Sequence, residues 1–152
     1  MKAGRWLVAL SILTLALVIH ERRASAAGCW ISATSVAFGS YDGVSPSDVT
    51  STGSVHYWCW GKIGTRAVYL SKGAAPTNNP RQMVFGANRL NYNLYLDAAR
   101  SRIWGDPTPY SYVVDTTENN PDVTLTVYGA IPFGQDVASG TYSDNITVTI
   151  LF

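Results

Sequence analysis

The last segment of the chain alternates between apolar and polar side chains, and this period of two limits the possible folds more than any other feature. Its apolar members are Ile146, Val148, Ile150 and Phe152, and its polar members are Asn145, Thr147 and Thr149. Successive side chains of a β-strand point to opposite faces of a sheet, whereas a helix repeats about every 3.6 residues. We therefore predict a strand with one buried face that runs to the final residue.

The same period recurs along the rest of the chain. Clear examples are 90–96 and 123–127, and weaker ones are 30–38, 54–60 and 66–70. Glycine, proline or asparagine interrupts the pattern roughly every 8 to 15 residues, which is typical of short strands joined by turns. No stretch of about a dozen residues keeps the apolar stripe and the capping residues of a helix. The sequence thus predicts an all-β domain.

Two of these segments also predict which side chains are buried. In 90–96 one face holds Leu90, Tyr92, Leu94 and Leu96, and the other holds Asn91 and Asn93. In 54–60 one face holds Val55, Tyr57 and Cys59, and the other holds His56, Trp58 and Trp60. About six or seven such strands in one small domain favour an immunoglobulin-like β-sandwich over a large barrel.

The first 26 residues have the parts of a secretory signal peptide. Lys2 and Arg5 supply the positive charge, 7–19 is an apolar stretch, and 24–26 reads Ala-Ser-Ala, the small residues that precede a cleavage site. The apolar stretch would span roughly 20 Å as a helix, too short for the roughly 30 Å hydrocarbon core of a bilayer. We therefore expect 1–26 to be removed and 27–152 to form one secreted domain.

Cys29 and Cys59 are the only cysteines. An even pair in an exported chain predicts a disulfide, and closing a loop of about 30 residues would stabilise the fold by roughly 3.5 kcal/mol in the chain-entropy model. Two free thiols or a metal pair are weaker alternatives, because the secreted part has one histidine, His56, and no clustered carboxylates.

Composition and motifs argue against several functional classes. The chain is only 14% charged, with a formal net charge of +1, and no run of basic residues suggests nucleic-acid binding. A Ser-His-Asp triad would need His56, which lies in a strand pattern without a nucleophile motif. The acidic residues stand mostly beside turn-forming residues, where solvated side chains are typical. We predict a protein that is not an enzyme and that needs no cofactor or metal.

The tryptophans leave one alternative open. Trp58, Trp60 and Trp104 are candidates for a surface aromatic site that stacks on a sugar ring. Half-buried β-sheet faces favour aromatic residues in any case, so packing is the more frequent role. The alternative function is a self-sufficient, lectin-like, carbohydrate-binding β-sandwich.

Seven short motifs follow one another along the secreted part. They are Gly28-Cys29; Phe38-Gly39-Ser40-Tyr41; Cys59; Leu90-Asn91-Tyr92-Asn93-Leu94-Tyr95 with Asp97-Ala98-Ala99-Arg100; Trp104-Gly105-Asp106; Val127-Tyr128-Gly129-Ala130-Ile131-Pro132 with Gln135; and Gly140-Thr141-Tyr142-Ser143-Asp144 onward to Phe152. Each motif is weak alone, but their order is specific. In these residues the chain resembles the spore coat protein U domain family, which includes the subunits of archaic, Csu-type chaperone-usher pili.

The resemblance implies a fold with a missing last strand. Such subunits look like immunoglobulin domains whose apolar groove stays open until a periplasmic chaperone, and later a neighbouring pilin or coat subunit, inserts a strand. The resemblance implies that the C-terminal strand borders this groove, with Phe152 as the anchor for the chaperone. Its groove residues would be Ile146, Val148, Ile150 and Phe152.

The resemblance also implies a location and a role. After passing through the periplasm and an outer-membrane usher, the protein would reach the cell surface as part of a fimbrium or a spore coat. It would be a structural subunit for adhesion, a biofilm or a coat, and a glycan or another surface receptor would be a further partner.

The chain differs from polymerising pilins ahead of Cys29. Those subunits carry an N-terminal donor extension, whereas cleavage after Ala26 would leave only Ala27 and Gly28. Two residues extend about 7 Å, against roughly 17 Å for a useful strand. We therefore expect the protein to accept a donor strand without giving one, and so to cap a fibre, sit at its tip or join a coat through another contact.

Overall fold

The computed structural model describes residues 26–61, 63–107, 114–116 and 122–152. The predicted signal peptide, 1–26, lies outside the described residues except for Ala26. The described part contains strands and no helix, as the sequence predicts. Its strands are β1 (Gly28–Thr34), β2 (Val49–Trp60), β3 (Arg66–Leu70), β4 (Arg81–Phe85), β5 (Asn88–Tyr95), β6 (Val114–Thr116), β7 (Asp122–Ile131) and β8 (Val148–Leu151).

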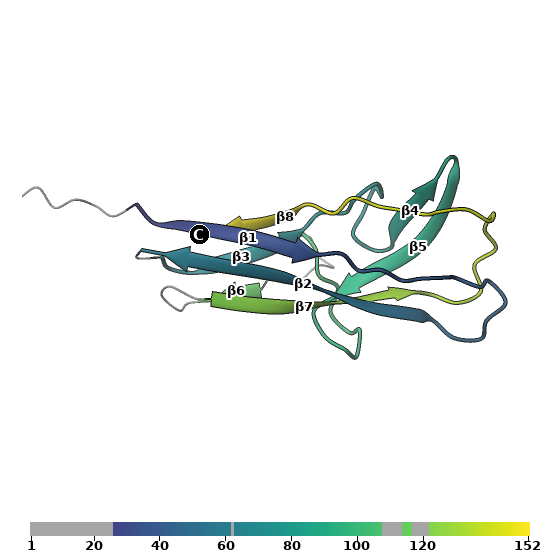
Figure 1. Cartoon of the computed structure of the whole chain (residues 1–152), viewed down its shortest axis with the longest axis horizontal. Coiled ribbons are helices and arrows are strands. Elements are labelled where there is room, and N and C mark those ends of the chain that lie inside the picture. The colour runs from purple at the N-terminus through teal and green to yellow at the C-terminus, as the bar shows by residue number, and fades with distance from the viewer. Residues whose placement is uncertain (1–25, 62, 108–113, 117–121) are drawn as a thin grey trace, which may run out of the picture.

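The strands form two antiparallel sheets. One has five strands in the order β1-β2-β7-β5-β4, and the other has three in the order β6-β3-β8. The three-stranded sheet lies at the same end of the molecule as β1, while β4 and β5 lie toward the other end (Figure 1). The fold is an immunoglobulin-like β-sandwich, which confirms the predicted class.

The core lies between the sheets and follows the alternation of the sequence. Within 54–60 of β2 the side chains that point inward are all buried, namely Val55, Tyr57 and Cys59. The outward ones are half-buried or exposed, namely His56, Trp58 and Trp60. Val68 and Leu70 of β3 are buried in the same apolar cluster and belong to the three-stranded sheet, so both sheets contribute to the core. The face assignment made for 54–60 is therefore confirmed.

Cys29 and Cys59 form the predicted disulfide. They are direct partners in the register of β1 and β2, with their Cα atoms 4.0 Å apart. Because β1 is an edge strand of its sheet, the bond fastens an element that only one neighbour otherwise holds.

Two strands are shorter than the sequence predicts. The first was expected to reach Phe38, but β1 ends at Thr34. Beyond that point the chain leaves the edge of β2 and leans over the inner face of the sheet. At the other terminus β8 covers only Val148–Leu151 of the expected 146–152, and Phe152 is 56% exposed.

The strands that the sequence pattern missed include β4. Its buried positions are Arg81 and Met83, and a charged residue on the inner face hides the alternation of apolar side chains. Asn93 of β5, expected on a polar face, is also buried. The two deviations have one cause, because the Arg81 side chain donates a hydrogen bond to Asn93 Oδ1 at 2.9 Å.

The Arg81 guanidinium is fully buried and is surrounded by oxygen acceptors. It donates to the backbone carbonyl of Ser71 at 2.9 Å and to that of Trp104 at 2.7 Å. It also donates to Asn78 Oδ1 at 3.0 Å and to the carbonyl of Leu70 at 3.3 Å. Burial lowers the pKa of Arg81 to about 10, and these neutral acceptors keep the cation hydrogen-bonded.

We predict that Arg81→Ala lowers the free energy of unfolding by about 3–5 kcal/mol, because it leaves several buried acceptors without a donor. Urea denaturation followed by tryptophan fluorescence measures the change. Arg89→Ala is the matched control, since Arg89 is exposed and donates only to local carbonyls of the β4–β5 turn. The control should lose less than about 1 kcal/mol. Equal losses in the two variants would contradict the role assigned to Arg81.

Candidate functional site

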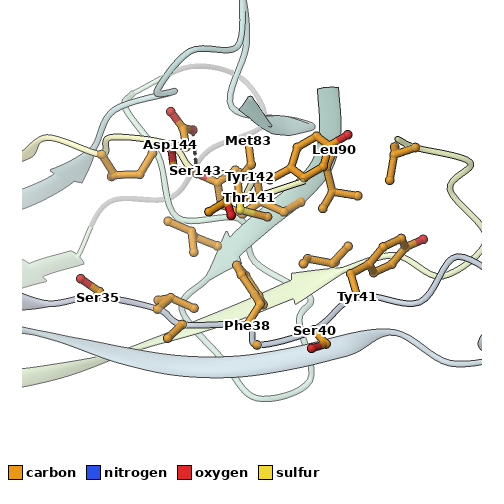
Figure 2. A pocket seen from close by; sticks show the side chains of 18 of the residues that line it. Ser35, Phe38, Ser40, Tyr41, Met83, Leu90, Thr141, Tyr142, Ser143 and Asp144 are labelled. Atoms are coloured by element: carbon orange, nitrogen blue, oxygen red, sulfur yellow. Dashed lines mark hydrogen bonds between the residues drawn. The ribbon is translucent and has the colours of Figure 1, made fainter. Parts of the chain in front are cut away.

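A long groove runs between two segments that are far apart in sequence. One wall is 33–44, which follows and includes the end of β1, and the other is 134–146 with Val148 of β8. Figure 2 shows the two walls facing each other, with Ser35 and Phe38 on one and Thr141–Asp144 on the other. The groove has a volume of about 1210 Å³.

The floor of the groove is the apolar core itself. It is formed by inward-facing side chains of several strands, namely Val55, Leu70, Met83, Leu90, Tyr92, Leu94, Val127 and Ile131. None of these side chains is more than 9% exposed. The wall side chains Val36, Phe38, Ile146 and Val148 are half-buried and pack against this cluster. A ligand seated in the groove would therefore meet an apolar floor between walls that also carry many polar groups.

A glycine allows the N-terminal wall to lie close to the sheet. A Cβ atom on Gly129 of β7 would lie 2.6 Å from Cγ1 of Val36 and 2.7 Å from Cζ of Phe38. The Phe38 ring also meets Tyr92 edge to face, with centroids 5.9 Å apart. The absent side chain of Gly129 is thus what lets this wall pack directly on the sheet.

Hydrogen bonds to the β3–β4 side of the domain position the C-terminal wall. Ser143 and Val84 exchange backbone bonds of 2.8 and 3.2 Å, and the amide of Ser71 donates to the carbonyl of Thr147 at 2.9 Å. Asp144 Oδ2 accepts from the Tyr92 hydroxyl at 2.7 Å. Burial, aided by this bond and by the negative charge of Asp144, raises the pKa of Tyr92. The phenol therefore stays protonated and keeps donating to the wall.

Gln135 closes the end of the groove near β5. Its side-chain amide accepts from the backbone N–H of Asn91 at 2.8 Å and donates to the carbonyl of the same residue at 2.9 Å. The backbone N–H of Gln135 donates to the Tyr41 hydroxyl at 2.7 Å. Tyr41 belongs to the N-terminal wall, so these bonds join the two walls at this end.

Along the groove the wall backbones keep few partners. Within the described chain, 35–41 forms no backbone–backbone hydrogen bond. The last strand, β8, pairs with β3 on one side only, and β1 is the edge of the other sheet. The two edge strands contact each other, and the groove lies where the segments that adjoin them run apart. The site therefore combines an apolar floor with unpaired strand edges.

The structure separates the residues predicted for the groove. Ile146 and Val148 line it, whereas Ile150 is half-buried in β8 outside the lining and Phe152 is exposed beyond the strand. The N-terminal wall is not predicted from the sequence. Its signal is the apolar pair Val36 and Phe38, which the period of two assigns to a continuous first strand.

One of the three tryptophans predicted at the surface is not there. Trp104 is fully buried, and its Nε1–H donates to the carbonyl of Val68 at 2.9 Å. Trp104 lies in the segment after β5, and its indole packs in the core against β3, so it cannot belong to a surface site. Trp58 and Trp60 are exposed, as predicted.

The groove does not carry a catalytic or metal-binding constellation. Among the described residues no group of three or more His, Cys, Asp or Glu side chains could hold a metal ion. His56 lies on the outer face of the sheet, where its Nε2 is 2.6 Å from Asp122 Oδ1. The groove offers strand edges and an apolar floor. Its acidic side chains, Asp42, Asp136 and Asp144, lie on its walls, where Asp144 accepts a hydrogen bond from Tyr92.

A search of the described residues finds no helix with the length and apolar character needed to cross a membrane.

Comparison with known proteins gives consistent results. The Spore Coat Protein U domain model matches residues 14–149. Protein U of Myxococcus xanthus is 32% identical over 128 residues, which cover 76% of this chain and 70% of that protein.

A solved structure has a similar fold. It is the crystal structure of the CsuC–CsuE chaperone–tip adhesion subunit pre-assembly complex from archaic chaperone-usher Csu pili of Acinetobacter baumannii. The matched chain is 23% identical, with a TM-score of 0.52, and the match covers 84% of this chain. This chain spans only 40% of the length of that one.

We predict that Gly129→Ala destabilises the protein by about 1–3 kcal/mol, because the added methyl group would overlap Val36 and Phe38. Chymotrypsin cleavage after Phe38 or Tyr41 should become faster as the N-terminal wall lifts from the sheet. Gly64→Ala is the control, since a Cβ there would meet no atom within 4 Å. If the two variants unfold at the same urea concentration and are cleaved at the same rate, Gly129 does not hold the N-terminal wall in place.

Proposed function

The chain belongs to the Spore Coat Protein U domain family, and from this premise we propose that it is a secreted structural subunit of a surface fibre or coat that accepts a strand from another protein. The observation that carries the proposal is the groove between 33–44 and 134–146 with Val148, which has an apolar floor and an N-terminal wall whose described backbone makes no backbone–backbone hydrogen bond over 35–41. No catalytic role is part of the proposal.

The geometry of the groove suits β-strand addition. In that mode of binding, backbone hydrogen bonds to an open edge supply affinity, and alternate side chains of the added strand enter apolar pockets. Here β8 offers an open edge, and Phe38 and Val148 stand on opposite walls above the buried floor. An extended segment with apolar residues at every second position would fill the groove and complete the sandwich.

Open strand edges are a hazard for a protein in solution, because they pair with other chains. A chaperone that covers the groove before assembly would remove this hazard. We propose a periplasmic chaperone as the first partner, an outer-membrane usher as the second, and a neighbouring pilin or coat subunit as the final donor. The structural likeness to a chain of a chaperone–subunit pre-assembly complex supports the chaperone as a partner.

The exposed end of β8 is the proposed chaperone contact. Leu151 is 54% exposed and Phe152 is 56% exposed, although both are large apolar residues whose burial would be favourable. A partner strand that pairs with the open edge of β8 would run beside this exposed end and cover Phe152, which by alternation shares the face of Val148.

The first test adds a donor strand to the purified, oxidised protein. A peptide of about 12 residues with apolar side chains at alternate positions should raise Tm by about 10 °C when present at about 100 times its Kd. A peptide of the same composition with its apolar residues clustered is the control, since it cannot present them to one face. Equal effects of the two peptides, or no effect of either, would overturn the proposal.

An isosteric pair of variants tests where the strand binds. Val148→Thr places a hydroxyl in the groove without changing its shape and should weaken the alternating peptide about tenfold. Thr149→Val makes the reverse change on the exposed face of β8 and should leave its Kd unchanged. Isothermal titration calorimetry measures both values, and equal Kd values for the two variants would place the peptide elsewhere.

A further inference from the structure

Three tryptophans lie together on the outer face of the five-stranded sheet, on the side opposite the groove. Trp30 of β1 and Trp58 of β2 are direct partners in the strand register, and Trp60 stands opposite Gly28. Their exposed fractions are 54%, 47% and 39%. We call Trp30, Trp58 and Trp60 the tryptophan platform.

The rings of the platform are positioned by their surroundings. The Trp58 and Trp60 rings lie 5.3 Å apart with an angle of 33° between their planes. Trp60 lies directly over the backbone of Gly28, where a Cβ atom would be 2.4 Å from its Cζ2 atom. The ring of Trp30 meets His56 edge to face at 5.8 Å. Two neighbouring strands joined by a disulfide thus present the three indoles in a fixed arrangement.

Polar groups border the platform on one side. His56 Nε2 lies 2.6 Å from Asp122 Oδ1, and the Asp122 side chain is 70% exposed. Asp122 is the register partner of Trp58 on β7, so its carboxylate stands beside the indole on the same face. Ser32 and Thr124 flank His56 on either side and add two hydroxyl groups. An aromatic surface with a few polar groups at its border is typical of sites that orient a small ligand.

We propose that the tryptophan platform binds pyranose rings of a neutral glycan. The apolar C–H face of a sugar ring packs on the face of an indole, and the ring hydroxyls can donate to Asp122 and exchange hydrogen bonds with His56. The outward residues that border the platform are Ser32, His56, Asp122 and Thr124, and none of them is a lysine or an arginine. Among the described residues at this border there is therefore no fixed cation that would attract an anionic polymer.

The size of the platform favours a glycan over a protein. A fully exposed tryptophan presents up to about 250 Å², so the three partly exposed indoles offer on the order of 350 Å². A stable protein–protein contact buries about 800 Å² on each partner. The platform suits two or three sugar rings, and no larger apolar surface adjoins it on β7, where threonines face outward.

The platform does not depend on the groove. The groove opens on the inner face of the sheet, so a strand inserted there would leave the platform exposed. A glycan site on this face would let each subunit hold a polysaccharide while its other face is engaged in assembly. The inference stands whether or not the proposed function is right.

The test titrates the oxidised protein with cellohexaose, chitohexaose, xylohexaose and laminarihexaose, using tryptophan fluorescence and isothermal titration calorimetry. At least one of them should bind, and Trp58→Ala or Trp30→Ala should weaken that binding at least about tenfold. Trp58→Tyr should keep part of the affinity. Phe133→Ala is the matched control, because Phe133 is an exposed aromatic residue beyond the far end of β7, and its loss should leave Kd unchanged.

Three results would overturn the inference. The first is the absence of binding by all four oligosaccharides at about 10 mM. The second is binding that neither Trp58→Ala nor Trp30→Ala weakens. The third is a loss of self-association or of a protein partner in Trp58→Ala without any sugar binding in the native protein, which would assign the platform to a protein contact. The response of Trp58→Ala to the alternating donor peptide should be normal in each case, so this test and that of the groove fail separately.

Discussion

The buried guanidinium of Arg81 is the interaction on which the rest of the structure depends. From β4 it reaches the end of β3 in the other sheet, Asn93 of β5 and the carbonyl of Trp104, so one side chain connects both layers of the sandwich. Two of the contacts that hold the C-terminal wall come from its neighbourhood: Ser71, whose carbonyl Arg81 binds, donates to Thr147, and Val84 of the same strand pairs with Ser143. The shape of the groove is thus set from inside the core. A cation is well suited to this task, because it donates in several directions at once while its acceptors stay neutral.

Much of the fold follows from periodicity alone. The inward set in β2 and the half-buried faces of β5 and β7 are where alternation places them, since a pleated strand with one covered face permits little else. The pairing of Cys29 with Cys59 follows from there being two cysteines. What periodicity does not reveal is β4, because Arg81 occupies an apolar position and its partners are backbone carbonyls, which leave no trace in a sequence. Asn93 is hidden for the same reason.

The functional surfaces were harder to predict than the strands. Ile146 and Val148 line the groove, but its N-terminal wall depends on Gly129, a residue almost 100 positions away, whose importance lies in the side chain that it lacks. Alternation along β2 correctly predicts that Trp58 and Trp60 are exposed. Trp104 was misplaced because the exposure of a lone tryptophan depends on tertiary packing. The position of Trp30 opposite Trp58 could not be predicted, because it depends on the register of β1 and β2.

Gln135 influences which strand edge of the domain can pair with another molecule. Its amide carries the same donor and acceptor as a peptide group, and it satisfies both backbone groups of Asn91 just where β5 and β7 part company. The Gln135 side chain thus takes the place of a neighbouring strand, and the backbone groups of Asn91 are not free to pair with another molecule. A strand that paired with β5 at Asn91 would first have to displace the Gln135 side chain. The free edge of β8, on the other side of the groove, needs no such displacement. One side-chain amide thereby helps to determine which edge of the domain is open to intermolecular strand pairing and which is closed.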